Sequence, residues 1–368
     1  MPKQSEKVQT LSLKQFTAFE EVTFDFSPGI NVLIGANGTG KSHVMKIIYS
    51  LLKAAESLHE YKSAIELSPK LRGVFRLNTT DNLIRFVVRD NPVHKNTVVL
   101  DYGNIKLNLS IRRGSDGKVK SAIKHNVNVT DVPTPPSLIY LPAQEFLSIN
   151  EGFISAYNRR ELPYDETYYD LALALNALPL RGDELVEIQE AVTFLRKILT
   201  GEGEDKEQDR EQKEVLTRQN DRFLFHLPEG DLDVHLVAEG YRKIATLYYL
   251  LKNGSLAKDS ILFWDEPEAN LNPKLIVEVG KVLQTLARAG MQIFVATHDY
   301  LLSHRLSLLA EYPSDKSADI RFFALHRPDR VSGVLVESGQ TLADIEHNPI
   351  LEEFAAHYDY ETSLFHNS

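Results

Sequence analysis

The sequence predicts an α/β protein in which the strands of a mostly parallel sheet alternate with helices. Residues 30–34, 260–264 and 291–297 are mostly apolar runs, the pattern of strands that are buried on both faces. Helical patterns over residues 43–59 and 273–289 follow the first two runs. Each run ends in residues that suit phosphate or metal chemistry, so the expected strands also mark the candidate functional residues.

The amino-acid composition restricts the classes of protein to which this chain can belong. The chain has 368 residues, of which 43% are hydrophobic and 25% charged, as in ordinary globular proteins. No apolar run approaches the roughly 20 residues that span a bilayer, and the polar N-terminus has no signal-peptide core. We therefore expect a cytoplasmic protein with no membrane partner. Zero cysteines exclude thiolate chemistry. The net charge of −10 argues against wholesale coating of nucleic acid but leaves a local basic surface open.

A glycine-rich loop follows the first apolar run. Residues 35–42 read Gly-Ala-Asn-Gly-Thr-Gly-Lys-Ser and match the phosphate-binding pattern G-x-x-x-x-G-K-[ST] at every fixed position. Glycines let the backbone approach phosphate oxygens, and the N–H groups and dipole of the next helix attract the anion. Lys41 is expected on the outer phosphates and Ser42 on Mg²⁺. The expected nucleotide-binding residues of this loop are Asn37, Gly38, Thr39, Gly40, Lys41 and Ser42. A plain glycine turn is the weaker interpretation.

Two carboxylates, Asp265 and Glu266, follow the second run. An aspartate at a strand end, downstream of a phosphate loop, is placed to hold Mg²⁺ through its water shell. Glu266 is the candidate for polarising the attacking water, which requires hydrogen-bond reach of the nucleophile. The alternative interpretation is an acidic strand end that merely lies at the surface. It explains the order of strand, acidic pair and loop less well than a catalytic role does.

Two further strand ends carry polar candidates. His298 follows the third run, and Gln144 follows a short apolar segment at 138–141. A histidine there can hydrogen-bond the γ-phosphate and orient the catalytic water. The Gln144 side chain can ligate Mg²⁺ or the water. A lone histidine at a strand end is more often structural, but the position of His298 after the acidic strand and a helix favours function.

Residues 72–132 change to short strands and turns, which indicates an antiparallel sheet. We expect strands at 73–77, 83–88, 97–100 and 105–111. The basic residues here are Arg112, Arg113, Lys118, Lys120 and Lys124. Their density suits contacts to a DNA backbone. It suits a solvated hairpin edge equally well, because lysines protect exposed edges from mispairing.

The remaining segments are helical or charged. Residues 146–200 are mostly helical in pattern, and residues 201–212 are nearly all charged or polar. Such a composition cannot bury a core, so we expect a mobile loop or an exposed helix start there. Residues 350–358 form an acidic, aromatic tail, which suits either docking of a partner or, more commonly, packing of a terminal helix on its own domain.

The order of these motifs resembles the ABC-type ATPase heads and, within them, the SMC, RecF and OLD-like branch that often serves bacterial anti-phage defence and DNA repair. The shared order is phosphate loop, Gln144, helical insertion, a helix start at Gly240, acidic strand end and His298, covering residues 8–340. The resemblance implies a P-loop NTPase fold of ABC-ATPase type with a mostly parallel core sheet, an antiparallel β subdomain and a short helical insertion. It also implies that two heads sandwich two ATP molecules.

The resemblance assigns the signature motif to residues 237–243. Gly240 would open a helix whose N–H groups and dipole face the γ-phosphate bound by the partner head, so it is expected to act in trans. Ala238 stands where the family has a serine, and the missing hydroxyl bears on hydrolysis rather than on ATP binding. Two interpretations of Arg242 and Lys243 remain open. Either one of them supplies a positive charge that compensates for the missing hydroxyl, or they are ordinary surface residues.

Residues 268–273 match the family's D-loop, which crosses the dimer interface. The same residues are compatible with a plain helix cap at Asn272 and Pro273 at the first helical position. In related ATPases a residue near Phe16 and Phe19 contacts the base, whereas we expect both aromatics in the core.

The resemblance divides the chain into four parts. They are an N-terminal lobe at 1–145, a helical insertion with the charged segment at 146–220, a C-terminal lobe at 221–345 and a tail at 346–368. The short gap between Gln144 and Gly240 predicts a helical lobe and not a long coiled coil. The chain after His298 lacks the acidic clusters of the Toprim nuclease domain, so we expect an ATPase without its own nuclease.

We therefore expect a Mg²⁺-dependent ATPase that dimerises around ATP and gates a separately encoded effector, a nuclease or toxin, in anti-phage defence. The expected metal ligands are Ser42, Gln144 and Asp265, and the expected catalytic residues are Lys41, Glu266 and His298. The alternative is a RecF-like clamp in which ATP controls DNA binding. An ATPase subunit of a transporter fits least, because the signature is not Leu-Ser-Gly-Gly-Gln.

Overall fold

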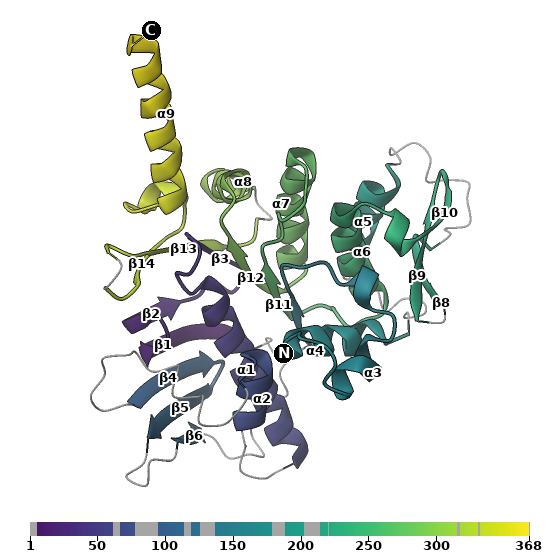
Figure 1. Cartoon of the computed structure of the whole chain (residues 1–368), viewed down its shortest axis with the longest axis horizontal. Helices are drawn as coiled ribbons and strands as arrows, with labels where there is room; N and C mark the ends of the chain where they lie inside the picture. Colours follow the sequence, from purple (N-terminus) through teal and green to yellow (C-terminus); the bar gives the residue numbers. More distant parts are fainter. Residues whose placement is uncertain are drawn as a thin grey trace. The chain divides into compact units, whose positions relative to one another are not determined.

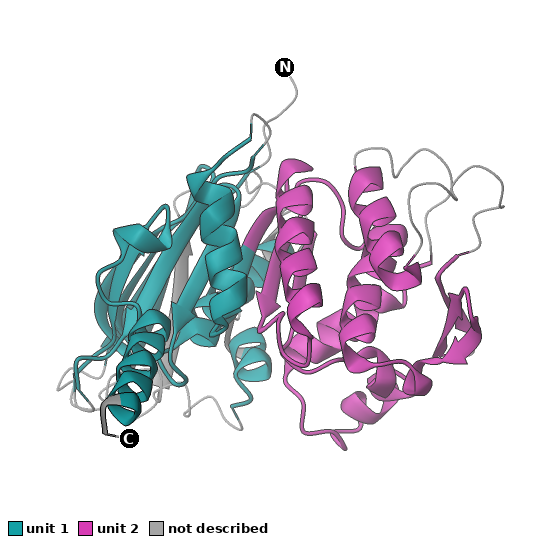
Figure 2. Cartoon of the chain, turned by 90° about the horizontal axis from the view of Figure 1, so that it is seen from above, with its two compact units in different colours: residues 1–135, 294–368 teal, residues 136–293 magenta. Residues whose placement is uncertain are grey.

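The computed structural model describes residues 6–61, 67–77, 95–113, 119–125, 137–178, 188–201, 214–219, 221–314, 317–329 and 332–367. Its contacts divide the chain into two compact units, shown in Figure 2. Unit 1 comprises residues 1–135 and 294–368, and unit 2 comprises residues 136–293. The boundary falls inside strand β12 (Gln292–Thr297).

Unit 1 contains an antiparallel sheet and a second group of strands with helices, labelled in Figure 1. Its strands are β1 (Val8–Phe16), β2 (Phe19–Asp25), β3 (Ile30–Gly35), β4 (Lys95–Tyr102), β5 (Ile105–Arg113), β6 (Val119–His125), β13 (Ile320–His326) and β14 (Leu335–Gly339). Its helices are α1 (Lys41–Tyr61), α2 (Leu67–Val74), α8 (Tyr300–Glu311) and α9 (Pro349–Asn367), with a short 3-10 turn at Leu342–Asp344.

The antiparallel sheet has the strand order β2-β1-β4-β5-β6 and confirms the predicted antiparallel β subdomain. Strands predicted at 97–100 and 105–111 lie within β4 and β5. The strand predicted at 73–77 is wrong, because α2 ends at Val74 and a turn follows. Leu71 and Val74 lie three residues apart, on one helical face, and both are fully buried. The strand predicted at 83–88 lies outside the described residues.

Strand β3 lies between β13 and β12, and all six of its residues are buried. It pairs in parallel with β13, with Val32 beside Phe322, and β14 adds an antiparallel edge to β13. The mostly apolar run at 30–34 is therefore a strand, as predicted, and it is covered on both faces. Phe16 and Phe19 are fully buried, which confirms them as core aromatics.

Unit 2 combines one parallel strand pair, a small antiparallel sheet and a group of helices. Its strands are β7 (Leu138–Leu141), β8 (Leu216–Gln219), β9 (Arg222–Leu227), β10 (Gly230–Asp233) and β11 (Ile261–Asp265). Its helices are α3 (Phe153–Asn158), α4 (Glu166–Leu175), α5 (Gln189–Thr200), α6 (Glu239–Lys252) and α7 (Pro273–Arg288), with 3-10 turns at Leu147–Ile149 and Val234–Leu236. The chain thus alternates strands and helices, which confirms the α/β class.

Strands β7 and β11 run parallel, with Phe263 beside Tyr140. Helix α5 packs against α6 and α7. The predicted helical insertion is present as α3, α4 and α5, and residues 202–212 of the predicted charged segment lie outside the described residues. The ends of β7 and β11 position Gln144 and the acidic pair.

Helix α9, yellow in Figure 1, carries the acidic aromatic tail. Its first turn is buried at Ile350, and the residues from Glu352 to Phe365 are exposed. The Phe354 ring contacts Tyr300 of α8 at a centroid distance of 4.8 Å. The expectation that this helix packs along its own domain is therefore wrong for most of its length.

Among the described helices, none combines the length and apolar character that a membrane-spanning segment requires.

Candidate functional site

The predicted phosphate loop joins β3 to α1 in unit 1. Its glycines Gly38 and Gly40 have φ angles of +79° and +100°, which side-chain-bearing residues rarely adopt. A Cβ atom on Gly40 would lie 2.9 Å from the ring of Phe19, which is fully buried. Glycine at position 40 is therefore required both by the backbone conformation and by the core beneath the loop.

Lys41 opens α1 and is almost fully buried, with 6% exposure. Its Nζ donates hydrogen bonds to the carbonyl oxygens of Gly35 at 2.6 Å and Ala36 at 3.1 Å. The Thr39 hydroxyl donates to the same Ala36 oxygen at 2.9 Å. These bonds hold the loop in a compact turn with its ammonium group at the start of the 21-residue helix. Residues 36–38 are exposed and Ser42 is partly exposed.

Asp265 ends β11 in unit 2 and is 9% exposed. One of its carboxylate oxygens accepts a hydrogen bond from the Tyr140 hydroxyl at 3.2 Å. Burial raises the pKa of Tyr140 well above its usual value, and the nearby Asp265 carboxylate raises it further. The tyrosine therefore remains a donor that orients the Asp265 carboxylate.

Glu266 follows with a φ of +48°, a strained conformation for a non-glycine residue. Lys243 of α6 reaches this turn, and its Nζ donates to the carbonyl oxygens of Glu266 at 3.4 Å and Ala269 at 2.9 Å. Lys243 is 5% exposed, and burial lowers its pKa while the surrounding glutamates raise it. The turn that carries Glu266 is thus held by a buried cation.

Arg242 and Glu145 form a second buried link in unit 2. Their side chains form an ion pair at 2.9 Å, and Arg242 also donates to the carbonyl oxygen of Val237 at 2.9 Å. Arg242 and Lys243 thus bind groups of their own chain, and Lys243 is not a surface residue. Gln144, beside Glu145, is exposed, and its side-chain amide donates weakly to the Tyr164 hydroxyl at 3.4 Å.

Helix α6 begins at Glu239, so Gly240 lies in its first turn, as predicted. Ala238 occupies the N-cap position and makes no side-chain capping bond. The Asn270 side chain donates to the Glu239 carboxylate at 2.7 Å, and a Cβ on Gly240 would lie 2.8 Å from Leu271. The predicted D-loop therefore contacts the predicted signature helix within one copy of the chain.

The predicted cap of α7 is confirmed. Asn272 accepts a hydrogen bond from the backbone N–H of Leu275 at 3.0 Å, and Pro273 occupies the first helical position. His298 is exposed in the turn after β12. Its neighbour Asp299 caps α8 through the N–H of Leu302 at 2.7 Å. The residue after the predicted histidine thus fixes the start of the next helix.

The sequence-predicted residues fall into two groups. Residues 37–42 and His298 belong to unit 1, and Gln144, Gly240, Asp265 and Glu266 belong to unit 2. Sequence reasoning missed two supporting side chains, Tyr140 and Glu145, and it named Lys243 only as a source of compensating charge or as a surface residue, not as the support of the Glu266 turn. Tyr140 and Glu145 belong to no recognised motif, and each contact joins residues far apart in the sequence, such as the 125 positions between Tyr140 and Asp265.

The residues present fit a nucleotide phosphate and a divalent cation. The phosphate loop is a glycine cradle in which a Cβ at Gly40 has no room, and Lys41 stands at a helix N-terminus, where anions bind. The Asp265 carboxylate and Ser42 hydroxyl are oxygen donors, which Mg²⁺ prefers. The loop can therefore hold a phosphate group, and the Asp265 carboxylate, considered by itself, offers oxygen atoms of the kind that Mg²⁺ prefers.

Strand β3, the glycine-rich loop and helix α1 together define a P-loop nucleotide-binding domain. A protein-family model described as "AAA domain, putative AbiEii toxin, Type IV TA system" matches residues 30–303. The chain belongs to this family. The match spans the phosphate loop, Gln144, helix α6, the acidic strand end and His298.

Similar proteins include a DNA replication and repair protein RecF from Staphylococcus haemolyticus. It is 26% identical over 295 residues, which are 75% of this chain and 70% of that protein. The SMC head domain from Thermotoga maritima is 13% identical, with a TM-score of 0.45 over 89% of this chain and 98% of that chain. An SmcHead bound to the C-winged helix domain of ScpA is 14% identical, with a TM-score of 0.49 over 90% and 97%. The family assignment rests on the sequence match.

Proposed function

We propose that this chain binds and hydrolyses ATP with Mg²⁺ between two copies of itself. The observation that carries the proposal is the phosphate loop, with buried Lys41 at the start of α1, in a chain of a P-loop ATPase family. ATP supplies the phosphoanhydride bond to be broken, and Mg²⁺ supplies positive charge at the phosphates. The residues of the chain position the nucleotide and stabilise the negative charge on its phosphates.

The proposed roles follow from the chemistry of each side chain. Lys41 and the N–H groups of the loop bind phosphate oxygens, and Ser42 binds the metal. Asp265, oriented by Tyr140, and Gln144 are the further metal ligands.

Glu266 accepts a hydrogen bond from the attacking water, and His298 hydrogen-bonds the γ-phosphate. The strained turn that Lys243 holds supports this role of Glu266, because residues in strained backbone conformations are often found at active sites. Gly240 acts on the nucleotide of the partner copy through the N-terminus of α6. Because Ala238 brings no hydroxyl to that helix start, hydrolysis is proposed to be slow.

The substitution Glu266→Gln tests this proposal. It keeps the shape of the side chain and removes the base, so we expect retained ATP binding, abolished turnover and an ATP-dependent dimer that persists. The measurements are the steady-state ATPase rate and light scattering during gel filtration. Glu278→Gln on α7 removes an ion pair with Lys281 and serves as the matched control. A wild-type rate in Glu266→Gln would overturn the assignment.

We further propose that closing and opening of the dimer gates a separately encoded effector, a nuclease or toxin, in anti-phage defence. The family description, which names a toxin of a type IV toxin–antitoxin system, supports an association of this kind. Affinity purification of the chain from its host, with identification of the co-purifying product of a neighbouring gene, tests it. Retention of that product should differ between wild type and Glu266→Gln in ATP. Purification of the chain alone from its host would contradict the gating role.

A RecF-like DNA clamp is the second candidate, favoured by the similarity to RecF. The edge strand β6 pairs with β5 so that Arg112 stands opposite Lys120 and Asn108 opposite Lys124. The side chains of Arg112, Arg113, Lys118, Lys120 and Lys124 lie outside the described residues. ATP-dependent, salt-sensitive retention of duplex DNA would support the clamp. Charge reversal at Arg112 and Lys120 should then abolish retention, and reversal at Lys14 in β1 should not.

A further inference from the structure

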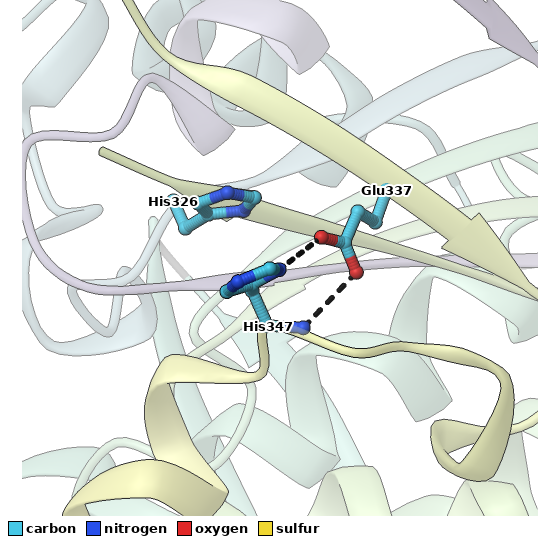
Figure 3. Close-up of side chains that lie close together, drawn as sticks. All are labelled: His326, Glu337 and His347. Atoms are coloured by element: carbon cyan, nitrogen blue, oxygen red, sulfur yellow. Dashed lines mark hydrogen bonds and ion pairs between the residues drawn. The ribbon is translucent and has the colours of Figure 1, made fainter. Parts of the chain in front are cut away.

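Two histidines and a glutamate form a cluster in unit 1, outside the residues assigned to the nucleotide (Figure 3). His326 ends β13, Glu337 lies in β14, and His347 precedes α9. The two strands pair with His326 opposite Leu335 and Ala324 opposite Glu337. One potential ligand atom from each of the three side chains lies within 4.8 Å of the other two. The three side chains thus converge from three separate segments.

The Glu337 carboxylate is held in a defined orientation. One oxygen accepts hydrogen bonds from the backbone N–H groups of Glu346 at 2.9 Å and His347 at 3.0 Å. The other oxygen lies 2.6 Å from Nδ1 of His347, as Figure 3 shows. Carboxylates that bind metals are commonly fixed by such outer hydrogen bonds. One oxygen is therefore anchored by the backbone while the other faces the histidine.

His326 supplies an independent observation. Its ring stacks on the ring of His347, with centroids 4.8 Å apart and planes 20° apart. Its Nδ1 atom is buried and makes no hydrogen bond to any residue that the structure describes. A buried polar atom without a partner is unfavourable, so an imidazole nitrogen in this position calls for a ligand.

We propose that His326, Glu337 and His347 bind a transition-metal dication, of which Zn²⁺ fits best. Two imidazoles and one carboxylate form a common three-ligand set for Zn²⁺, with a further position for water. Nitrogen donors disfavour Mg²⁺, so this site is distinct in chemistry from the cation of the nucleotide. His347 is 53% exposed, which leaves its ring room to turn toward the metal and leaves the site open to solvent.

The bound metal would join three segments at one edge of the unit. Strands β13 and β14 are already paired, and His347 lies two residues before Pro349, where α9 begins. Metal ligation of His347 therefore fixes the base of α9 to the strand pair. This role does not depend on the proposed ATPase activity, since none of the three residues belongs to that site.

The test is a calorimetric titration of the full chain, dialysed against a chelator, with Zn²⁺ alone and with Mg²⁺ alone. We expect one Zn²⁺ per chain and no Mg²⁺ binding at the cluster. Glu337→Gln and His347→Ala should weaken Zn²⁺ binding at least tenfold. His357→Ala, which removes an exposed histidine of α9 from outside the cluster, is the matched control and should bind like wild type.

A second measurement separates ligand loss from misfolding. Zn²⁺ should raise the melting temperature of wild type and of His357→Ala and leave that of His347→Ala unchanged, while the metal-free chains melt alike. His347 is exposed, so its replacement disturbs packing least among the three ligands. His326→Ala removes the remaining ligand and is measured as well, provided that its metal-free melting temperature equals that of wild type. Absence of saturable Zn²⁺ binding in wild type, or equal affinity in all variants, would overturn the proposal. Displacement of Zn²⁺ by equimolar Mg²⁺ would do so as well.

Discussion

The guanidinium of Arg242 lies 2.9 Å from the carboxylate of Glu145. The side chains are 16% and 2% exposed, so water screens this ion pair little. Glu145 directly follows the proposed metal ligand Gln144, and Arg242 lies two residues after Gly240 in α6. The pair therefore ties the segment after β7 to the start of α6.

Arg242→Met should destabilise unit 2 because it leaves a buried carboxylate without its cation. Removing one partner of a buried pair costs about 3–5 kcal/mol, and we expect the lower end because Arg242 is partly exposed. Urea denaturation measures the loss. The double variant Arg242→Met, Glu145→Met should recover much of it, since apolar replacement of both partners is often neutral. Equal stability of wild type and the single variant would show that the pair contributes nothing.

Lys243→Met should slow turnover without weakening ATP binding. The substitution removes two hydrogen bonds to the turn that carries Glu266, at a cost of about 1–3 kcal/mol in stability. The ATPase rate and the affinity for a fluorescent ATP analogue are measured together. Lys252→Met, which removes an ion pair with Glu214 at the other end of the same helix, is the control and should keep its rate. A parallel fall in affinity would contradict a role confined to the turn.

Ala238→Ser should raise the rate of hydrolysis. The serine supplies the hydroxyl that the resemblance to ABC-type heads predicts at this position, and it also caps α6, which stabilises a helix by about 1 kcal/mol. Ala238→Asn separates the two effects because it caps the helix without supplying a hydroxyl or a charge that would repel the phosphates. A faster rate in the serine variant alone, measured at saturating ATP, supports the assignment of the signature. Equal rates in both variants would attribute the effect to the cap.

Gly40→Ala should weaken ATP binding at least tenfold. The added Cβ would lie 2.9 Å from the Phe19 ring, and the φ of +100° is unfavourable for alanine, so the loop must shift. Gly38→Ala is the comparison, because its φ is also positive but a Cβ there meets nothing within 4 Å. We expect the smaller loss of affinity at Gly38. The opposite order would show that the core contact beneath the loop does not govern phosphate binding.

Local patterns in the sequence were enough to predict the strands that carry the candidate site residues and to locate the phosphate loop. Mostly apolar runs predicted β3, β11 and β12, because a strand buried on both faces needs apolar residues at most positions. The same reasoning failed at residues 73–77, where Val74 and Phe75 favour a strand by composition. There, burial of Leu71 and Val74 on one face of α2 outweighed that preference.

The sequence by itself determined the α/β class, the phosphate loop, the acidic strand end and the family order of motifs, because each depends on residues within a few positions of one another. Only the tertiary structure decided that Tyr140 orients Asp265, that Lys243 holds the Glu266 turn and that His326 meets Glu337 and His347. These contacts join distant segments through strand register and helix packing. No local spacing encodes such contacts, because they arise only when the whole core is packed.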